Sequence, residues 1–389
     1  MTRIVRPITN PSGSSLNQTL MKAYAFLLIV SLVGMCGTSS AEEEKKECIG
    51  RTVFAAPEKM EWATYPTTKH LISEGGGHTF STNISAEHEY LSYNDDQLTI
   101  RVSDITTLED FQTQRNAIIH KGEVAKTEVL EEIETNKKLL QSISTMGYSQ
   151  DAIDRQKKII ADLEKSIAAT AIKEYDLGIA DSHVLGSQAM PSEVLLWRKN
   201  RIYYFNFKTP DQVGTQAIKD LIAHFQPREL YQVPNGPGVC MPYGFIHDDG
   251  KTGFSVKNSL RFTSTPNVIL SLINASMGDQ TKATTGTYDT DYRPGYDAQN
   301  WKKSKIMEKF YIGERMTTLE GWRLDPRPES KEQDRAWFAI AHVGGLASPL
   351  IAAQMFTFQK GTDGLKDFTP APEAVIPKFL KLTQSISSQ

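Results

Sequence analysis

The sequence predicts an α+β protein with two domains, each a mostly antiparallel sheet with packed helices. Residues 107–172 lack proline and are rich in Glu, Lys, Ala, Leu and Ile, which indicates a long helical hairpin in the first domain. Short apolar or alternating runs on both sides indicate strands. A Pro/Gly-rich stretch separates the two halves. We therefore expect one domain over residues 42–232, a hinge at 233–238 and a second domain over 239–389.

The first forty-one residues predict an export signal. Three basic residues are its only charges, and they precede the apolar run Ala23–Met35. This run is too short for an ordinary membrane-spanning helix. Small residues before Glu42 favour signal-peptidase cleavage between Ala41 and Glu42. We expect residues 1–41 to be a signal peptide and the mature protein to be periplasmic.

Three alternatives stay open at this end of the chain. Translation from Met21 would give a signal peptide of conventional length, whereas a start at Met35 would leave a cytosolic form. Cys36, followed by Gly-Thr-Ser-Ser, would allow a lipid anchor. Contact with a membrane is otherwise expected only through the export signal.

Cleavage after Ala41 changes the formal net charge from −3 to −6, because it removes three positive charges and no negative one. A mildly acidic chain without a basic run argues against a nucleic-acid partner. Cys48 and Cys240 remain. Exported thiols seldom stay free, so we favour a disulfide between them over two unrelated buried thiols.

The first domain is expected to begin with strands and continue into the helical hairpin. The expected strands are Cys48–Ala56, Glu61–Tyr65 and Gln97–Val102. Met146-Gly147-Tyr148 interrupts the helical period, and Ser149 with Asp151 is suited to cap the second helix. The charges on the outer face are most simply solvated, although this face is also a candidate for binding a partner; they include Glu131, Glu132, Lys137 and Lys138.

The rest of the chain predicts further strands, each half ending in a helix. Lys199-Asn200 predicts a tight hairpin turn, and residues 278–300 predict a long loop. The expected helices are Asp211–Phe225 and Glu373–Ile386. The expected strands are His183–Leu185, Glu193–Arg198, Arg201–Phe207, Val239–Ile246, Phe254–Phe262, Val268–Ile273, Lys309–Arg315, Trp322–Leu324, Ala336–Val343 and Ile351–Phe358.

No catalytic, cofactor or metal-binding constellation stands out. Ser348 is the nearest imitation of a hydrolase nucleophile, but it lacks Gly-x-Ser-x-Gly. His247-Asp248-Asp249-Gly250 is read as an Asp-Gly hairpin turn in preference to a metal or acid/base cluster. Asp289, Asp291 and Gly295 lack calcium-loop spacing, and Gly75–His78 lacks the residues of a phosphate loop. Aromatic residues of a possible sugar platform alternate as core residues do: Trp197, Tyr203, Tyr204 and Phe205.

Three groups of residues, in a fixed order along nearly the whole mature chain, carry a resemblance to a known family. The first is Cys48-Ile49-Gly50-Arg51 with Pro57. The second is Gly238-Val239-Cys240 with Gly244-Phe245-Ile246, then Arg261-Phe262 and Pro266–Leu270. The third is Leu319–Trp322 with Trp337, Gly345 and Ser348-Pro349-Leu350, where Ala352 stands in place of an expected second proline. In these groups the chain resembles the type VI secretion immunity proteins that neutralise lipase or phospholipase effectors.

The resemblance implies a noncatalytic periplasmic protein that binds its cognate phospholipase effector, one to one, between two domains and inhibits it sterically. It implies no cofactor, and it does not identify the contact residues, because each immunity protein matches its own effector. The alternatives are a noncatalytic envelope scaffold, a carbohydrate-binding protein or an envelope hydrolase. The hydrolase is disfavoured because the sequence lacks a nucleophile motif.

Overall fold

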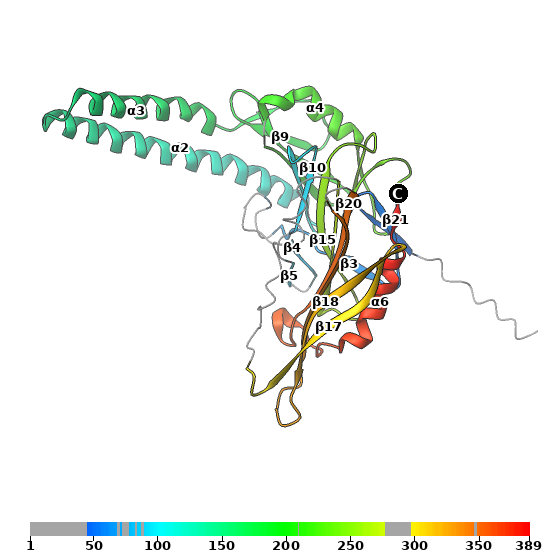
Figure 1. Cartoon of the computed structure of the whole chain (residues 1–389). Helices are drawn as coiled ribbons and strands as arrows, with labels where there is room; N and C mark the ends of the chain where they lie inside the picture. The colour runs from blue at the N-terminus through cyan, green and yellow to red at the C-terminus, as the bar shows by residue number, and fades with distance from the viewer. Residues whose placement is uncertain are drawn as a thin grey trace, which may run out of the picture. The chain divides into compact units, whose positions relative to one another are not determined.

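A thirteen-stranded sheet, with antiparallel pairing throughout, organises the protein (Figure 1). The computed structural model describes residues 45–389 except 68–70, 72–77, 82–83, 87–88, 209, 277–296 and 346–347. The signal peptide expected at 1–41 and residues 278–296 of the loop expected at 278–300 therefore lie outside the described residues. Among the described residues, no helix is long and apolar enough to cross a membrane. The predicted α+β class and antiparallel pairing are confirmed.

The large sheet runs through both halves of the chain. Its order is β17-β18-β19-β20-β16-β15-β6-β7-β11-β10-β9-β8, and β3 also pairs with β15. The strands of the first half are β3 (Met60–Trp62), β6 (Tyr90–Tyr93), β7 (Leu98–Val102), β8 (Lys173–Tyr175), β9 (Ser182–Gly186), β10 (Pro191–Arg198) and β11 (Arg201–Phe207). Those of the second half are β15 (Phe254–Phe262), β16 (Val268–Ala275), β17 (Trp301–Ile312), β18 (Arg315–Pro326), β19 (Ala336–Gly345) and β20 (Ser348–Thr357).

Strand β15 joins the two halves, so the expectation of a separate sheet in each half is wrong. Phe254–Lys257 pair with β6, Leu260–Phe262 pair with β3, and the opposite edge of β15 pairs with β16. Backbone hydrogen bonds of the sheet thus join residues that precede the 233–238 segment to residues that follow it. Residues 45–389 form one compact unit. The division of the chain into two domains at 233–238 stays a prediction, although the two halves share one sheet.

Two small sheets contain Cys48 and Cys240. One has the order β1-β2-β21, with β1 at Lys45–Ile49, β2 at Thr52–Ala56 and β21 at Ser387–Ser388. The other has the order β12-β14-β13, with β12 at Phe225–Pro227, β13 at Gly238–Met241 and β14 at Gly244–His247. A further pair joins β4 (His78–Thr79) to β5 (Ser85–Ala86). Two expected strands, Cys48–Ala56 and Val239–Ile246, are each a hairpin instead, because the backbone takes a positive φ at Gly50 and at Tyr243.

The predicted helical hairpin is confirmed as α2 (Leu108–Thr145) and α3 (Gln150–Thr170), which lie side by side (Figure 1). Thr107 and Asp110 form a reciprocal capping box at the start of α2. Ser149 occupies the predicted N-cap position of α3 with Asp151 in the first turn, but the Ser149 side chain makes no cap hydrogen bond. Between the helices, the Gln156 Nε2 group donates to Asn136 Oδ1 over 2.7 Å.

The remaining helices are α4 (Pro210–His224), the short η1 (Thr362–Gly364) and α6 (Pro372–Gln384). Phe379 of α6 stacks on Phe262 with 5.1 Å between ring centroids, which fixes the helix against the sheet. The expected strand Lys309–Arg315 is wrong, because Gly313 has φ +58 and turns the chain between the long strands β17 and β18. The two-residue turn at Lys199-Asn200 between β10 and β11 is confirmed, with φ of 50 and 56.

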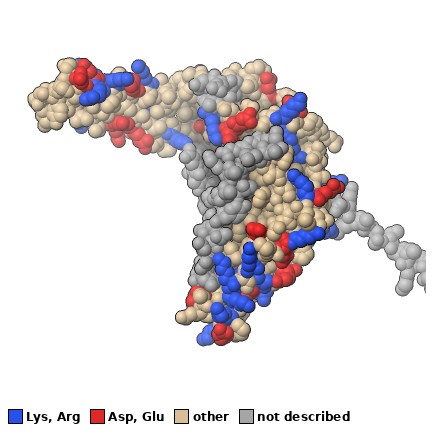
Figure 2. All heavy atoms as spheres, in the orientation of Figure 1, with Lys and Arg blue, Asp and Glu red and all other residues tan. Residues whose placement is uncertain are grey.

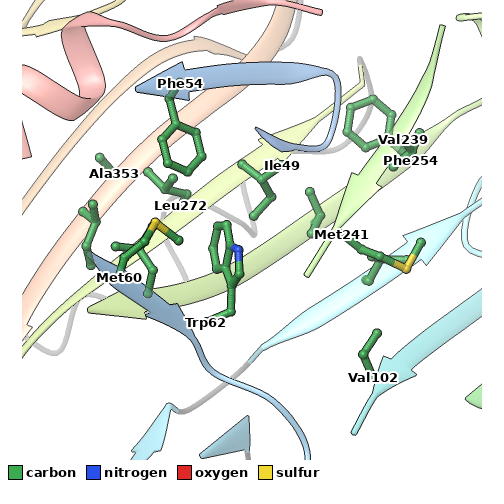
Figure 3. Close-up of a cluster of buried hydrophobic side chains, with 14 of the residues drawn as sticks. Ile49, Phe54, Met60, Trp62, Val102, Val239, Met241, Phe254, Leu272 and Ala353 are labelled. Carbon is green, nitrogen blue, oxygen red and sulfur yellow. The ribbon is translucent and has the colours of Figure 1, made fainter. Parts of the chain in front are cut away.

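The main core lies where the small sheets meet the large one. Figure 3 shows side chains from β1, β2, β3, β13, β15 and β16 pointing toward one another. They include Ile49, Phe54, Trp62, Val239 and Leu272, all of which are buried. Burial of each such side chain stabilises the fold by about 1.5–3 kcal/mol. The core therefore packs the chain's first hairpin against strands of its second half.

The buried carboxyl group of Glu89, the residue before β6, packs against the large sheet. Ser259 of β15 donates its hydroxyl to Glu89 Oε1, and Ser259 Oγ lies 2.5 Å from Ser271 Oγ of β16. Glu89 Oε2 is buried with no partner among the described residues. Burial raises the pKa of Glu89 to about 7, although the nearby Lys257 and the Ser259 hydroxyl oppose this. Near neutral pH, the Glu89 carboxyl group thus binds a proton more tightly in the folded protein than in the unfolded chain.

We predict that Glu89→Gln changes how stability depends on pH. The folded-state pKa of Glu89 lies above its ordinary value, so this group destabilises the wild type progressively as pH rises from about 4 to about 7. The free energy of unfolding of the variant, relative to wild type, should increase by up to about 3 kcal/mol between pH 4 and pH 8. Urea unfolding at each pH measures it. Glu308→Gln, on the exposed surface of β17, is the control; equal pH dependence of both variants would contradict the prediction.

Candidate functional site

The two cysteine-containing hairpins meet at one point, which we call the disulfide node: Glu47, Cys48, Gly50, Arg51, Arg228, Cys240 and Asp248. Cys48 and Cys240, 192 residues apart in sequence, form the predicted disulfide. The backbone amide of Gly50 donates to the Cys240 carbonyl over 2.8 Å, and the amide of Cys240 donates to the Gly50 carbonyl over 2.7 Å. One covalent bond and two hydrogen bonds thus join the small sheets.

Gly50 is required by the geometry of the node. Its φ is +59, and a Cβ atom there would lie 2.1 Å from the side-chain oxygen of Asn274 on β16. The same oxygen accepts the backbone N–H of Arg51 over 2.8 Å. Any larger residue would therefore displace Asn274 and break this contact between β16 and the first hairpin.

Arg51 uses its guanidinium to bind the second hairpin. Its two terminal nitrogens donate to the carboxylate oxygens of Asp248 over 2.7 and 2.8 Å. They also donate to the carbonyl oxygens of Gly238 and Thr252. Such a bidentate pair has a fixed geometry. The guanidinium of Arg51 therefore stabilises the node, and its charge is paired with Asp248.

The segment His247–Gly250 forms a turn, but the expected hairpin is wrong, because β14 and β15 on either side belong to different sheets. Asp248 is the partner of Arg51. Asp249 accepts the backbone amides of Lys251 and Thr252, and these donors lower the pKa of its carboxyl. Among the described residues, no group of three or more His, Cys, Asp or Glu is arranged to hold a metal ion.

A second ion pair, which the sequence analysis missed, lies buried beneath the disulfide. Arg228 Nη1 lies 2.5 Å from Glu47 Oε1, and the two side chains are 1% and 0% exposed. The other Arg228 nitrogen, Nη2, donates to the carbonyls of Cys48 and Met241. Glu47 also accepts the amides of Cys48 and Tyr231. The only feature of the sequence that could have indicated this pair is that Glu47 and Arg228 each lie beside an apolar strand.

Next to the node lies a cleft of about 820 Å³. Its wall includes Arg51, Phe254, Asn274, Ile312 and Pro349, together with the C-terminal strand β21. Among the described residues of its lining there is no histidine or cysteine, and the one acidic side chain is the exposed Glu314.

The other sequence candidates have structural positions or lie outside the described residues. Tyr203, Tyr204 and Phe205 are buried and Trp197 packs against Phe111, so they are core residues, as predicted, and form no exposed platform. Ser348 begins β20 and pairs with Gly345. His78 is buried against Tyr65, and burial lowers its pKa to about 3. Outside the described residues lie Met21, Met35, Cys36, Ala41, Glu42, Gly75–Gly77, Asp289, Asp291 and Gly295.

Comparisons with known proteins give matches among solved structures. No family model matches the chain. No curated protein matches it either. The chain is similar to the immunity protein TplEi of the T6SS from Pseudomonas aeruginosa complexed with "L" peptide, with a TM-score of 0.42 and 12% identity over 89% of this chain and 98% of that chain.

Two further structures are similar over the same share of this chain. The apo form of TplEi from Pseudomonas aeruginosa has a TM-score of 0.40 and 11% identity, covering 97% of that chain. A chain of the Tle4–Tli4 complex has a TM-score of 0.41 and 10% identity, again with 97% of that chain covered. These TM-scores are below 0.5, so the likeness by itself assigns neither a family nor a function to this chain.

We predict that Arg228→Met strongly destabilises the protein. The substitution leaves the Glu47 carboxylate buried without its cation, which should lower the free energy of unfolding by about 3–5 kcal/mol. Chemical denaturation under non-reducing conditions measures this. Lys137→Met is the control, because Lys137 forms an exposed pair with Glu164 over 3.5 Å. That variant should lose about 0–1 kcal/mol, and similar losses in both variants would show that the buried pair has no special role.

Proposed function

We propose that this chain is a periplasmic immunity protein that binds and inhibits the cognate lipase effector of a type VI secretion system. One observation carries the proposal. The first two groups of residues that resemble this family, Cys48–Arg51 and Gly238–Cys240, are distant in sequence and meet in the disulfide node. Residues of both groups, together with Asn274 and Asp248, form one connected set of contacts.

A noncatalytic mechanism is part of the proposal. The candidate nucleophile Ser348 is paired in a β hairpin, and Asp248 and Asp249 hold a turn. In our proposal the protein acts sterically, by covering the route of the lipid substrate or by holding mobile parts of the effector. Such inhibition needs a large, rigid surface and one inhibitor per effector, and it requires no cofactor.

The compact packing of residues 45–389 supports this mechanism. Protection of the producing cell requires binding in the nanomolar range or tighter, about −12 kcal/mol. Tight binding is favoured when few side chains and loops have to become ordered on association. An interface of roughly 2,000 Å² or more would suit such binding. We propose that the effector lies between surfaces contributed by residues 42–232 and 239–389. The shared sheet and the disulfide node would hold these surfaces in place before binding.

We propose that the protein is exported to the periplasm. A Cys48–Cys240 disulfide is consistent with an oxidising compartment outside the cytoplasm. In this proposal, cleavage between Ala41 and Glu42 releases the mature chain.

The proposal predicts stoichiometric inhibition of a lipase encoded beside this gene. Titrating the protein into that purified enzyme should reduce its phospholipase activity linearly, to near zero at one molar equivalent, because each bound inhibitor removes one enzyme. An unrelated lipase is the control and should keep its activity. Failure to form a complex on size exclusion, or full effector activity in excess protein, would refute the function.

A further inference from the structure

The outer end of the helix pair differs in composition from the rest of the pair. We call residues 139–150 the helix-pair tip; this segment contains no Asp, Glu, Lys or Arg. By contrast, nine of the eighteen residues 121–138 and eight of the fifteen residues 151–165 are charged. Figure 2 shows the outer end of the pair in tan, beyond the last red and blue side chains on the face seen. The part of the pair farthest from the sheet is thus the part without charges.

The tip nevertheless presents large apolar side chains to solvent. Met146 is 71% exposed, Tyr148 is 57% exposed and Leu139 is 49% exposed. Packing between the two helices does not explain them, because the residues that are buried in the pair, such as Ile133 and Ile160, lie nearer the sheet. Loss of charged residues together with exposed Met and Tyr is the composition found at the centres of protein–protein interfaces.

Two hydroxyl groups of the tip can lose water at little cost. The hydroxyl of Ser144 donates to the Leu140 carbonyl over 2.7 Å, and that of Thr145 donates to the Gln141 carbonyl over 2.8 Å. These donors already have partners within their own helix. Burying them against another surface therefore leaves neither hydroxyl without a hydrogen bond.

We propose that the helix-pair tip inserts into an uncharged, largely apolar recess of the effector; this inference rests on the proposed function. The absence of charge on the tip matches such a recess, because a charged tip would have to be desolvated without a partner. The 38 residues of α2 span about 57 Å, so the tip reaches a part of the partner far from anything bound at the sheet. Contacts at two distant points would enlarge the interface.

A membrane or a second copy of this chain fits the tip less well. Segments that bind in the plane of a bilayer combine large apolar residues with Lys or Arg beside them. Lys137 and Lys138 directly precede the tip, but Lys137 is paired with Glu164 over 3.5 Å. Within the tip, Met146 and Tyr148 stand among hydroxyl and amide side chains, and the acidic Asp151 follows it directly. Self-association would bury two small convex tips against each other, which offers much less area than a stable dimer needs.

The experiment compares two matched double variants of the mature chain. Met146→Ser with Tyr148→Ser removes apolar area from the tip. Leu130→Ser with Ile159→Ser is the control, because these side chains are 43% and 45% exposed and lie on the charged part of the same helices. Affinity for the purified effector is measured by calorimetry, and thermal unfolding checks that both variants stay folded. We expect the tip variant to bind at least about 30-fold more weakly than wild type, and the control to bind within about threefold.

The outcomes separate this inference from the proposed function. If wild type binds the effector and the tip variant binds as tightly as the control variant, the tip inference is wrong and the immunity function stands. If wild type does not bind the effector, both fall. Two parallel measurements test the other occupants: sedimentation with vesicles of phosphatidylglycerol and phosphatidylethanolamine, and analytical ultracentrifugation of the protein alone. If wild type binds vesicles or forms dimers and the tip variant does not, the tip contacts a membrane or a second copy. Either result would contradict the proposal that it inserts into the effector.

Discussion

The buried ion pair between Glu47 and Arg228 is the contact on which the joining of the two small sheets depends. Both charges are almost fully buried, and each is stabilised by hydrogen bonds with neighbouring backbone groups as well as by its partner. Such a pair adds little net stability compared with apolar residues, but it tolerates almost no displacement, because either charge left alone is costly. The adjacent Cys48–Cys240 disulfide and the Arg51–Asp248 pair therefore act on strands whose positions are already fixed.

The local features of the fold could be predicted from the sequence. The helix pair followed from a long proline-free segment with helical spacing, and the turn at Lys199-Asn200 followed from two residues that tolerate a positive φ. The disulfide followed from counting cysteines in an exported chain. Each of these inferences needs only neighbouring residues or a very small number of candidate partners.

The features that the sequence did not predict depend on partners far apart in the chain. Nothing near Phe254–Phe262 indicates that this strand pairs with β6 and β3, so one sheet was taken for two. The break at Gly50 depends on contact with Asn274, which no local pattern reveals. Glu47 and Arg228 each look like an ordinary surface charge until both strands are placed. The long strand β17 was underestimated because its exposed lysines interrupt the apolar pattern.

These contacts lead to one view of how the molecule works. The sheet and the node belong to one compact unit, and the helix pair extends from the sheet (Figure 1). The outer end of the pair carries no charged residue. The candidate chemical groups that the structure describes hold turns or fill the core. A protein built in this way is suited to recognise a partner by shape, and the immunity function that we propose needs only that property.

Native-state hydrogen exchange at the amides of Gly50 and Cys240 tests the central claim, that the node is fixed before any partner binds. These two amides bond to each other's carbonyls across the small sheets. If the node is rigid, both should exchange only by global unfolding, with the same free energy as the slowest amides of β15 and β16. Exchange through a local opening, at a free energy several kcal/mol lower, would show that the two small sheets separate in the folded protein and would contradict the account.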